Sequence, residues 1–161
     1  MKRILTACAL LFTLAASAQN GLRAGAKASA FQAASGKGVD MAYGGEAVVT
    51  FSIKNLNVGT GAEVLYFENM DDVAVPAYLT VGYDFTPQWS AHIDGGQVLY
   101  GRTVKGVRTN GNLYLGAGAR YNLGRTFYVG AQYSMYGFKV KGFDPTYTHG
   151  GSLSFGVRLK G

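Results

Sequence analysis

The sequence predicts an all-β protein, an eight-stranded antiparallel up-and-down transmembrane β-barrel. After residue 20, apolar and polar side chains alternate in eight stretches of about 10–12 residues, which is the period of a β-strand with two unlike faces. The connections between these stretches are alternately long and short, as in outer-membrane barrels. The polar faces hold mainly Gly, Ser, Thr, Asn, Gln and Tyr, which suits the packed interior of a small barrel better than the solvated face of a soluble one.

The first four strands are expected at 21–31, 43–53, 56–67 and 75–85. Each has apolar residues at alternate positions, and these are expected to face lipid. They are Leu22, Ala24, Ala26, Ala28 and Ala30 in the first strand; Ala47, Val49, Phe51 and Ile53 in the second; Leu56, Val58, Ala62, Val64 and Tyr66 in the third; and Val75, Ala77, Leu79, Val81, Tyr83 and Phe85 in the fourth. Short turns are expected at 54–55 and 86–88, after the second and fourth strands.

The last four strands are expected at 89–100, 110–122, 126–138 and 151–160. Their lipid-facing residues are Trp89, Ala91, Ile93 and Leu99; then Leu113, Leu115, Ala117, Ala119 and Tyr121; then Phe127, Val129, Ala131, Tyr133 and Met135; then Leu153, Phe155, Val157 and Leu159. A third short turn at 123–125 separates the sixth strand from the seventh.

The longer connections are expected at 33–42, 68–74, 101–109 and 139–149. Barrels of this class keep their short turns in the periplasm and their long loops outside the cell. We therefore expect a protein of the outer membrane of a Gram-negative bacterium, with both chain ends in the periplasm.

Residues 1–18 are expected to be a cleaved signal peptide, and 19–161 the barrel domain. Lys2 and Arg3 precede a short apolar run at 4–14, and 16–18 (ASA) is a small-residue cleavage site. The run is too short for a membrane helix, which needs about 20 residues. Cys8, the only cysteine, leaves with this peptide, so we expect no thiol chemistry, and we also expect no metal site and no cofactor.

The inward face is predicted to carry an ion-pair network across the lumen. Its charges nearly balance, and charges buried inside a barrel need partners. The residues are Arg23, Lys27, Glu46, Glu63, Asp84, Asp94, Arg120 and Arg158, with Lys160 at the end of the last strand. A lumen filled in this way leaves no sizeable pore.

The composition argues against a soluble or nucleic-acid-binding protein. Charged residues make up 15% of the chain, well below the usual share of about 25% in soluble domains. Two of the charges behind the formal net charge of +6 lie in the expected signal peptide. No basic run with interleaved aromatic residues remains, so nucleic acid is not an expected partner.

Two groups of residues are candidates for chemistry. Ser90, His92 and Asp94 share the inner face of one strand and fit either a nucleophile, base and orienting acid or a set of structural hydrogen bonds. Five cations in the long connections fit either lipopolysaccharide phosphates or ordinary solvated loops. They are Arg102, Lys105, Arg108, Lys139 and Lys141.

The chain resembles the OmpX-like and PorT-like outer-membrane β-barrel families, the latter common in Bacteroidota. The resemblance lies in 21–25 (GLRAG), which is similar to their first strand, and in 75–79 (VPAYL) and 83–87 (YDFTP), which are similar to their central strand and turn. It implies a small eight-stranded barrel, with a role in surface interaction or protein secretion in some members.

Three functions remain open from the sequence. The first is a structural or surface-interaction barrel that contacts membrane lipid, lipopolysaccharide, and surface or secretion-system proteins through its long loops. The second is a small porin-like channel. The third is a lipid-modifying enzyme that uses Ser90, His92 and Asp94.

Overall fold

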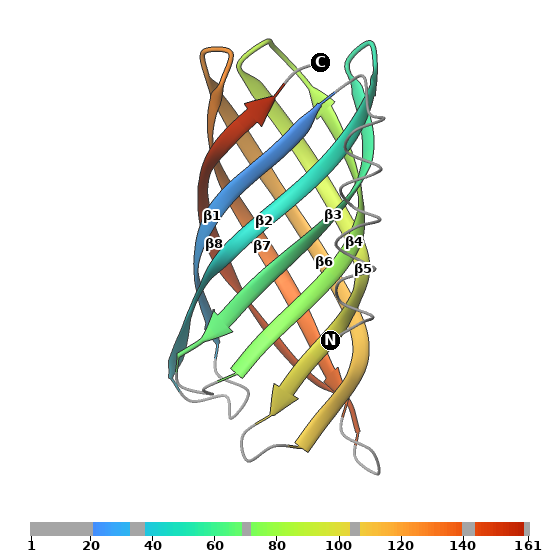
Figure 1. Cartoon of the computed structure of the whole chain (residues 1–161), viewed down its shortest axis with the longest axis vertical. Helices are drawn as coiled ribbons and strands as arrows, with labels where there is room; N and C mark the ends of the chain where they lie inside the picture. The colour runs from blue at the N-terminus through green and yellow to red at the C-terminus, as the bar shows by residue number, and fades with distance from the viewer. Residues whose placement is uncertain (1–20, 33–37, 69–71, 104–106, 140–143, 160–161) are drawn as a thin grey trace.

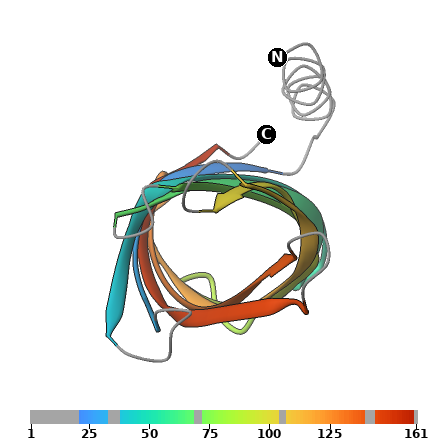
Figure 2. The same cartoon turned by 90° about the horizontal axis from the view of Figure 1, so that it is seen from below.

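The structure, a computed structural model, describes residues 21–32, 38–68, 72–103, 107–139 and 144–159, so the expected signal peptide, Lys105, Lys141 and Lys160 lie outside the described residues. In this part of the chain eight antiparallel strands form a closed barrel (Figures 1 and 2), which confirms the predicted fold class. The strands are β1 (Leu22–Gln32), β2 (Val39–Ile53), β3 (Leu56–Phe67), β4 (Asp72–Asp84), β5 (Trp89–Thr103), β6 (Val107–Leu123), β7 (Phe127–Lys139) and β8 (Thr146–Leu159). None of the described segments is a helix of the length and apolarity that crossing a membrane requires.

The barrel closes along a regular seam between its first and last strands. β1 and β8 pair antiparallel without a register shift, from Leu22 opposite Leu159 to Phe31 opposite Gly150. Closure of this kind pairs every strand on both sides and leaves no open sheet edge, which is what a β-structure needs where water is absent.

Short turns close one end of the barrel, where the sequence predicts them. Lys54 has a left-handed φ of 54° in the turn between β2 and β3, and Gly124 has a φ of 71° between β6 and β7, where glycine carries no steric penalty. Between β4 and β5, the hydroxyl of Thr86 accepts hydrogen bonds from the backbone N–H groups of Gln88 and Trp89 at 3.2 and 2.9 Å.

The opposite end differs from the sequence prediction, because the strands run well into the expected long connections. β2 begins at Val39, β4 at Asp72 and β8 at Thr146, while β5 and β6 pair as far as Thr103 and Val107. The apolar alternation ends where the strands leave the apolar band, but backbone pairing continues for as long as the neighbouring strand offers donors and acceptors. The connections at 33–42, 68–74, 101–109 and 139–149 are therefore shorter than predicted.

The register of β4 and β5 shifts beside Pro76. Val75 lies opposite Tyr100 and Pro76 opposite Val98, so β5 contributes one extra residue at this point. Proline has no N–H to donate to the ladder, and such an irregularity is where a strand tolerates it.

The outer wall of the barrel is apolar. Leu79, Ile93 and Leu153 expose 69%, 63% and 68% of their surface, fractions that would be unusual for leucine and isoleucine in a water-soluble protein. Among the described residues, the exposed charged side chains lie at turns or strand ends: Lys54, Glu68, Arg125, Lys139 and Asp144. The exposed surface is thus an uncharged apolar band between two polar rims.

The packed core lies inside the barrel, and it has two halves. Toward the long-connection end, Phe31 and Phe67 pack against Tyr136 with ring centroids 5.1 and 6.1 Å away, and Tyr136 packs against Tyr114 at 5.0 Å. Toward the short-turn end, the lumen holds Arg23 and Arg120 instead, both buried. The lumen is therefore closed by aromatic rings on one side and lined by buried charges on the other.

Candidate functional site

Glu63 is the centre of a hydrogen-bonded network at the middle of the lumen. It lies on the inner face of β3 and is 1% exposed. Its Oε1 accepts hydrogen bonds from Lys27 Nζ at 2.8 Å and from Tyr114 Oη at 2.9 Å, and its Oε2 accepts one from Tyr136 Oη at 2.8 Å. One carboxylate thus binds side chains from β1, β6 and β7, which makes it a crosslink through the barrel interior.

Gln132 on β7 extends this network to β5. Its Oε1 accepts a second hydrogen bond from Lys27 Nζ at 2.7 Å. Its Nε2 donates to Asp94 Oδ2 at 2.7 Å and to Tyr114 Oη at 3.0 Å. Because the amide both accepts and donates, it links the buried ion pair to a second buried carboxylate.

A second carboxylate, Glu46, lies directly opposite Glu63 in the β2–β3 register. Like charges in this position repel each other. Tyr128 Oη donates to Glu46 Oε1 at 2.8 Å, while Glu63 is neutralised by Lys27. Each acid therefore has donors of its own: Tyr128 for Glu46, and Lys27, Tyr114 and Tyr136 for Glu63.

Glycines provide the space for these tyrosines. A Cβ added at Gly61 would lie 2.6 Å from two ring atoms of Tyr78, and one at Gly25 would lie 2.5 Å from Tyr128 Oη. Gly156 lies opposite Tyr128 and beside its ring. The rings of Tyr78 and Tyr128 thus occupy space that a side chain at these glycines would fill.

The structure places the predicted network residues as follows. Arg23, Lys27, Glu46, Glu63, Asp94 and Arg120 are buried in the lumen, and Asp84 and Arg158 near the short-turn end are half-buried. Within the described strands, one ion pair joins two of the eight, Lys27 and Glu63. Arg23, Arg120 and Arg158 form no ion pair within 4.0 Å of an acid in this part of the chain.

Ser90, His92 and Asp94 are buried on the inner face of β5, but they do not form a hydrogen-bonded relay. His92 Nε2 lies 3.7 Å from Asp94 Oδ2, beyond hydrogen-bond distance, and neither ring nitrogen of His92 has a partner among the described residues. A nucleophile needs a base within reach of its proton, and the base needs an orienting partner. The three side chains thus lie on the same face of β5, but they do not make the contacts that acyl transfer requires.

The five cations expected in the long connections are not all loop residues. Arg102 and Arg108 lie in strands β5 and β6, where they are directly opposite each other, so their placement in a loop was wrong. Lys139 is the exposed last residue of β7. Lys105 and Lys141 lie outside the described residues. Lipopolysaccharide contact by this set stays a prediction.

Sequence reasoning placed Tyr78, Tyr114, Tyr128, Tyr136 and Gln132 on the polar, inward faces of their strands but did not include them in the predicted network. A signal was present in the register: Tyr78 lies opposite Gly61 and Gly96, and Tyr128 lies opposite Gly156. An inward tyrosine across from glycine indicates a ring folded over the neighbouring strand. The alternation alone does not reveal this pattern, because it requires knowing which residues pair.

The chain matches no known family model and no curated protein sequence. Its fold is similar to three solved structures. Neisserial surface protein A (NspA) is 18% identical, with 89% of this chain and 97% of that chain covered at a TM-score of 0.59. The outer membrane enzyme PagL is 14% identical, with 84% and 98% covered at 0.60. Ail, the attachment invasion locus protein of Yersinia pestis, is 16% identical, with 87% and 97% covered at 0.54.

Proposed function

We propose that this chain is an integral outer-membrane β-barrel of a Gram-negative bacterium, with a side-chain-filled lumen and a structural or surface-interaction role. The observation that carries the proposal is the inverted distribution of side chains: buried charges inside and an uncharged apolar band outside. A closed barrel with this distribution is stable in lipid, where its outer wall needs no water.

Aromatic side chains at both ends of the apolar band support a membrane position. Near the short turns, Trp89 packs against Tyr121 with ring centroids 4.9 Å apart, and Phe127 stacks on Phe155 at 5.9 Å. Near the other end, Tyr43 and Tyr66 are exposed on the same wall, opposite each other in the β2–β3 register. Two such girdles are typical of barrels that sit between two headgroup layers.

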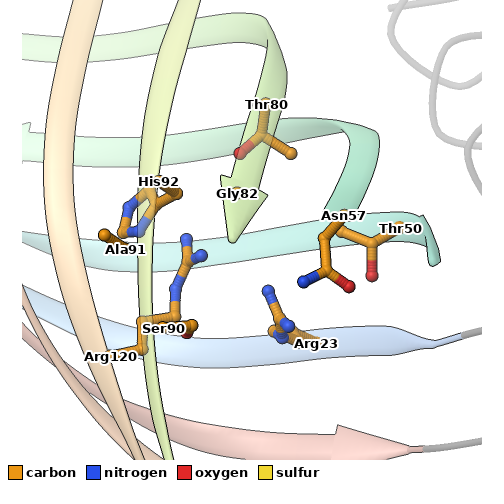
Figure 3. Close-up of a pocket in the computed structure, with 9 residues that line it drawn as sticks. All are labelled: Arg23, Thr50, Asn57, Thr80, Gly82, Ser90, Ala91, His92 and Arg120. Carbon is orange, nitrogen blue, oxygen red and sulfur yellow. The ribbon is translucent and has the colours of Figure 1, made fainter. Parts of the chain in front are cut away.

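The filled lumen supports a role other than conduction. Tyr114, Tyr128 and Tyr136 are fully buried across it, and the Lys27–Glu63 pair joins β1 to β3. One cavity in the described part of the lumen, lined by Arg23, His92 and Arg120 among others (Figure 3), measures about 10 Å³, the space of about one water molecule. This interior favours a structural barrel over a porin-like channel.

We propose that the functional surface of this barrel lies at the end that carries the longer connections. The fold itself does not decide the activity, since similar barrels include an enzyme and an attachment protein. The missing contacts around His92 favour a non-enzymatic role. Segments 21–25, 75–79 and 83–87 resemble the OmpX-like and PorT-like families, and this resemblance supports partners of the surface or secretion class.

Trp89, the only tryptophan, provides the test of membrane embedding. It is 53% exposed at the short-turn end of the outer wall. After refolding into bilayers, lipids brominated near the headgroup are expected to quench its fluorescence more than lipids brominated near the bilayer centre. In a Trp89→Phe background, Ile93→Trp moves the probe about 9 Å deeper, because four residues rise about 13 Å along a strand tilted near 45°.

The deeper probe is expected to reverse the preference, so that central bromines quench more strongly. Equal quenching of both probes at both depths, or none at all, would contradict the membrane position. Fractionation of the two bacterial membranes on a density gradient tests the outer-membrane location separately, and recovery in the inner membrane would contradict it.

A further inference from the structure

A groove of about 580 Å³ lies on the outer wall of the barrel, where β7, β8, β1 and β2 are neighbours. Small exposed residues form its floor: Ala28, Ala30, Ala131 and Gly151. Two larger side chains, Tyr133 and Leu153, border this floor and are 57% and 68% exposed. A Cβ added at Gly151 would meet nothing within 4 Å, so the floor is open to the surroundings of the barrel. The volume is typical of ligand sites, which measure about 300–1,000 Å³.

The groove has polar groups at its long-connection end. Tyr133 Oη lies 2.5 Å from Nδ1 of His149, which is exposed on β8 two residues before Gly151. Because this contact uses Nδ1, Nε2 is the ring nitrogen that an external group can bind. Lys139, exposed on the same face of β7 as Tyr133, adds a cation nearer the long connections. The described outer faces of β1, β2, β7 and β8 carry no carboxylate, although Asp144 is exposed just before β8. This part of the wall therefore suits an anionic group.

The strand register places the groove in the half of the apolar band that is nearer the long connections. A row of paired residues that starts at Leu22, the partner of Leu159, reaches His149 on β8 after one circuit. Rows therefore move toward the long-connection end as the strand number rises. The row from Trp89 reaches Phe155 three strands later, and His149 lies six residues farther along β8.

This register gives the depth of the polar end. With strands about 4.8 Å apart and tilted near 45°, His149 lies about 24 Å from Trp89 along the barrel axis. The apolar band of such barrels is about 25 Å tall, so Trp89 and His149 lie at its two boundaries. The groove extends from His149 toward the middle of the band, as an acyl chain does below its headgroup.

An acyl chain suits this groove better than a second copy of the barrel does. The barrel is rounded when it is seen end-on (Figure 2), so two copies would meet along convex walls and leave the groove unfilled. Apolar surfaces within lipid attract each other through van der Waals packing, and a flexible chain can follow a floor of small residues.

We propose that this groove binds one acyl chain of lipopolysaccharide, with a phosphate oxygen of its lipid A part accepting a hydrogen bond from Nε2 of His149. The inference rests on the proposed outer-membrane position, in which the long-connection end lies in the lipopolysaccharide leaflet. Lipid A phosphates carry negative charge that no amine of the lipid balances, whereas phosphatidylethanolamine carries its own ammonium group. His149 and Lys139, on a wall without carboxylates in its described part, favour the anionic lipid.

Native mass spectrometry counts the lipids that remain on each refolded barrel after incubation with lipid A in detergent. The wild type is expected to retain one lipid A in preference to phosphatidylethanolamine. Ala30→Leu and Gly151→Leu fill the groove and are expected to weaken retention about tenfold, because the chain loses its packing. His149→Ala is expected to weaken it about fivefold, the effect of one lost hydrogen bond.

Ala47→Leu is the matched control, because it adds the same side chain to the exposed face of β2 outside the groove. It is expected to retain lipid A as the wild type does. The proposal would be overturned by equal retention in Ala47→Leu and the groove-filling variants, by equal retention of the two lipids, or by barrel dimers without bound lipid. Gly151→Leu serves alone if Ala30→Leu does not fold. Trp89 quenching does not depend on the groove, so the membrane proposal is tested separately.

Discussion

Replacing Glu63 with alanine is expected to destabilise the barrel by about 3–5 kcal/mol, the usual cost of leaving a buried charge without its partner. Lys27 would keep its charge in the lumen, and Tyr114 and Tyr136 would lose their acceptor. Urea-induced unfolding in lipid vesicles, followed by Trp89 fluorescence, measures the free energy of unfolding.

The control and a second variant separate the ion pair from a general loss of packing. Glu68→Ala removes an exposed carboxylate just after the same strand and is expected to change stability by less than about 0.5 kcal/mol. Adding Lys27→Met to Glu63→Ala removes the stranded charge and is expected to recover part of the loss. If Glu63→Ala unfolds at the same urea concentration as the wild type, the network is not what holds the lumen together.

The second large effect is expected from two neighbouring glycines on β5. A Cβ at Gly96 would lie 2.1 Å from the carbonyl oxygen of Ala77 and 2.6 Å from Cα of Tyr78, and neither backbone atom can move without breaking the β4–β5 pairing. A Cβ at Gly95 meets only Leu115 Cδ2, at 3.9 Å on the outer wall. Gly96→Ala is therefore expected to cost about 3 kcal/mol or to prevent folding, and Gly95→Ala to cost almost nothing.

The folded fraction of each variant is measured by the heat-dependent shift in gel mobility that compact barrels show. Adjacent glycines provide a second, independent comparison on β8, where a Cβ at Gly150 would lie 2.0 Å from Ala30 O and one at Gly151 meets nothing within 4 Å. If the two variants of each pair fold to the same extent, the added methyl group is accommodated at Gly96 and Gly150, and the close contacts given for these positions are wrong.

The fold could be predicted because one physical signal is repeated in every strand. On β5, the alternation assigns Ser90, His92 and Asp94 to one face and Ile93 to the other, and the structure buries the first three and exposes the last. Strand ends were less predictable, since backbone pairing beyond the apolar band leaves no trace in side-chain polarity. The shift beside Pro76 depends on the partner strand in the same way.

The site was predictable as a set of inward residues but not as a set of contacts. Lys27 and Glu63 lie on strands that are not neighbours, so their contact depends on barrel diameter and stagger. The ion-pair network predicted from the sequence requires a carboxylate within ion-pair distance of each arginine. The structure instead places Tyr128 beside Glu46 and leaves Arg23, Arg120 and Arg158 grouped at one end.

Single-barrel recording in planar lipid bilayers tests the central claim, a membrane barrel whose lumen is closed by its own side chains. The wild-type protein, inserted and shown to be folded, is expected to give no stable conductance steps at either voltage polarity. Stable conductance steps of uniform size, one for each inserted barrel, would contradict the claim. Ions would then be passing through the space that Glu63 and the luminal tyrosines fill in the structure.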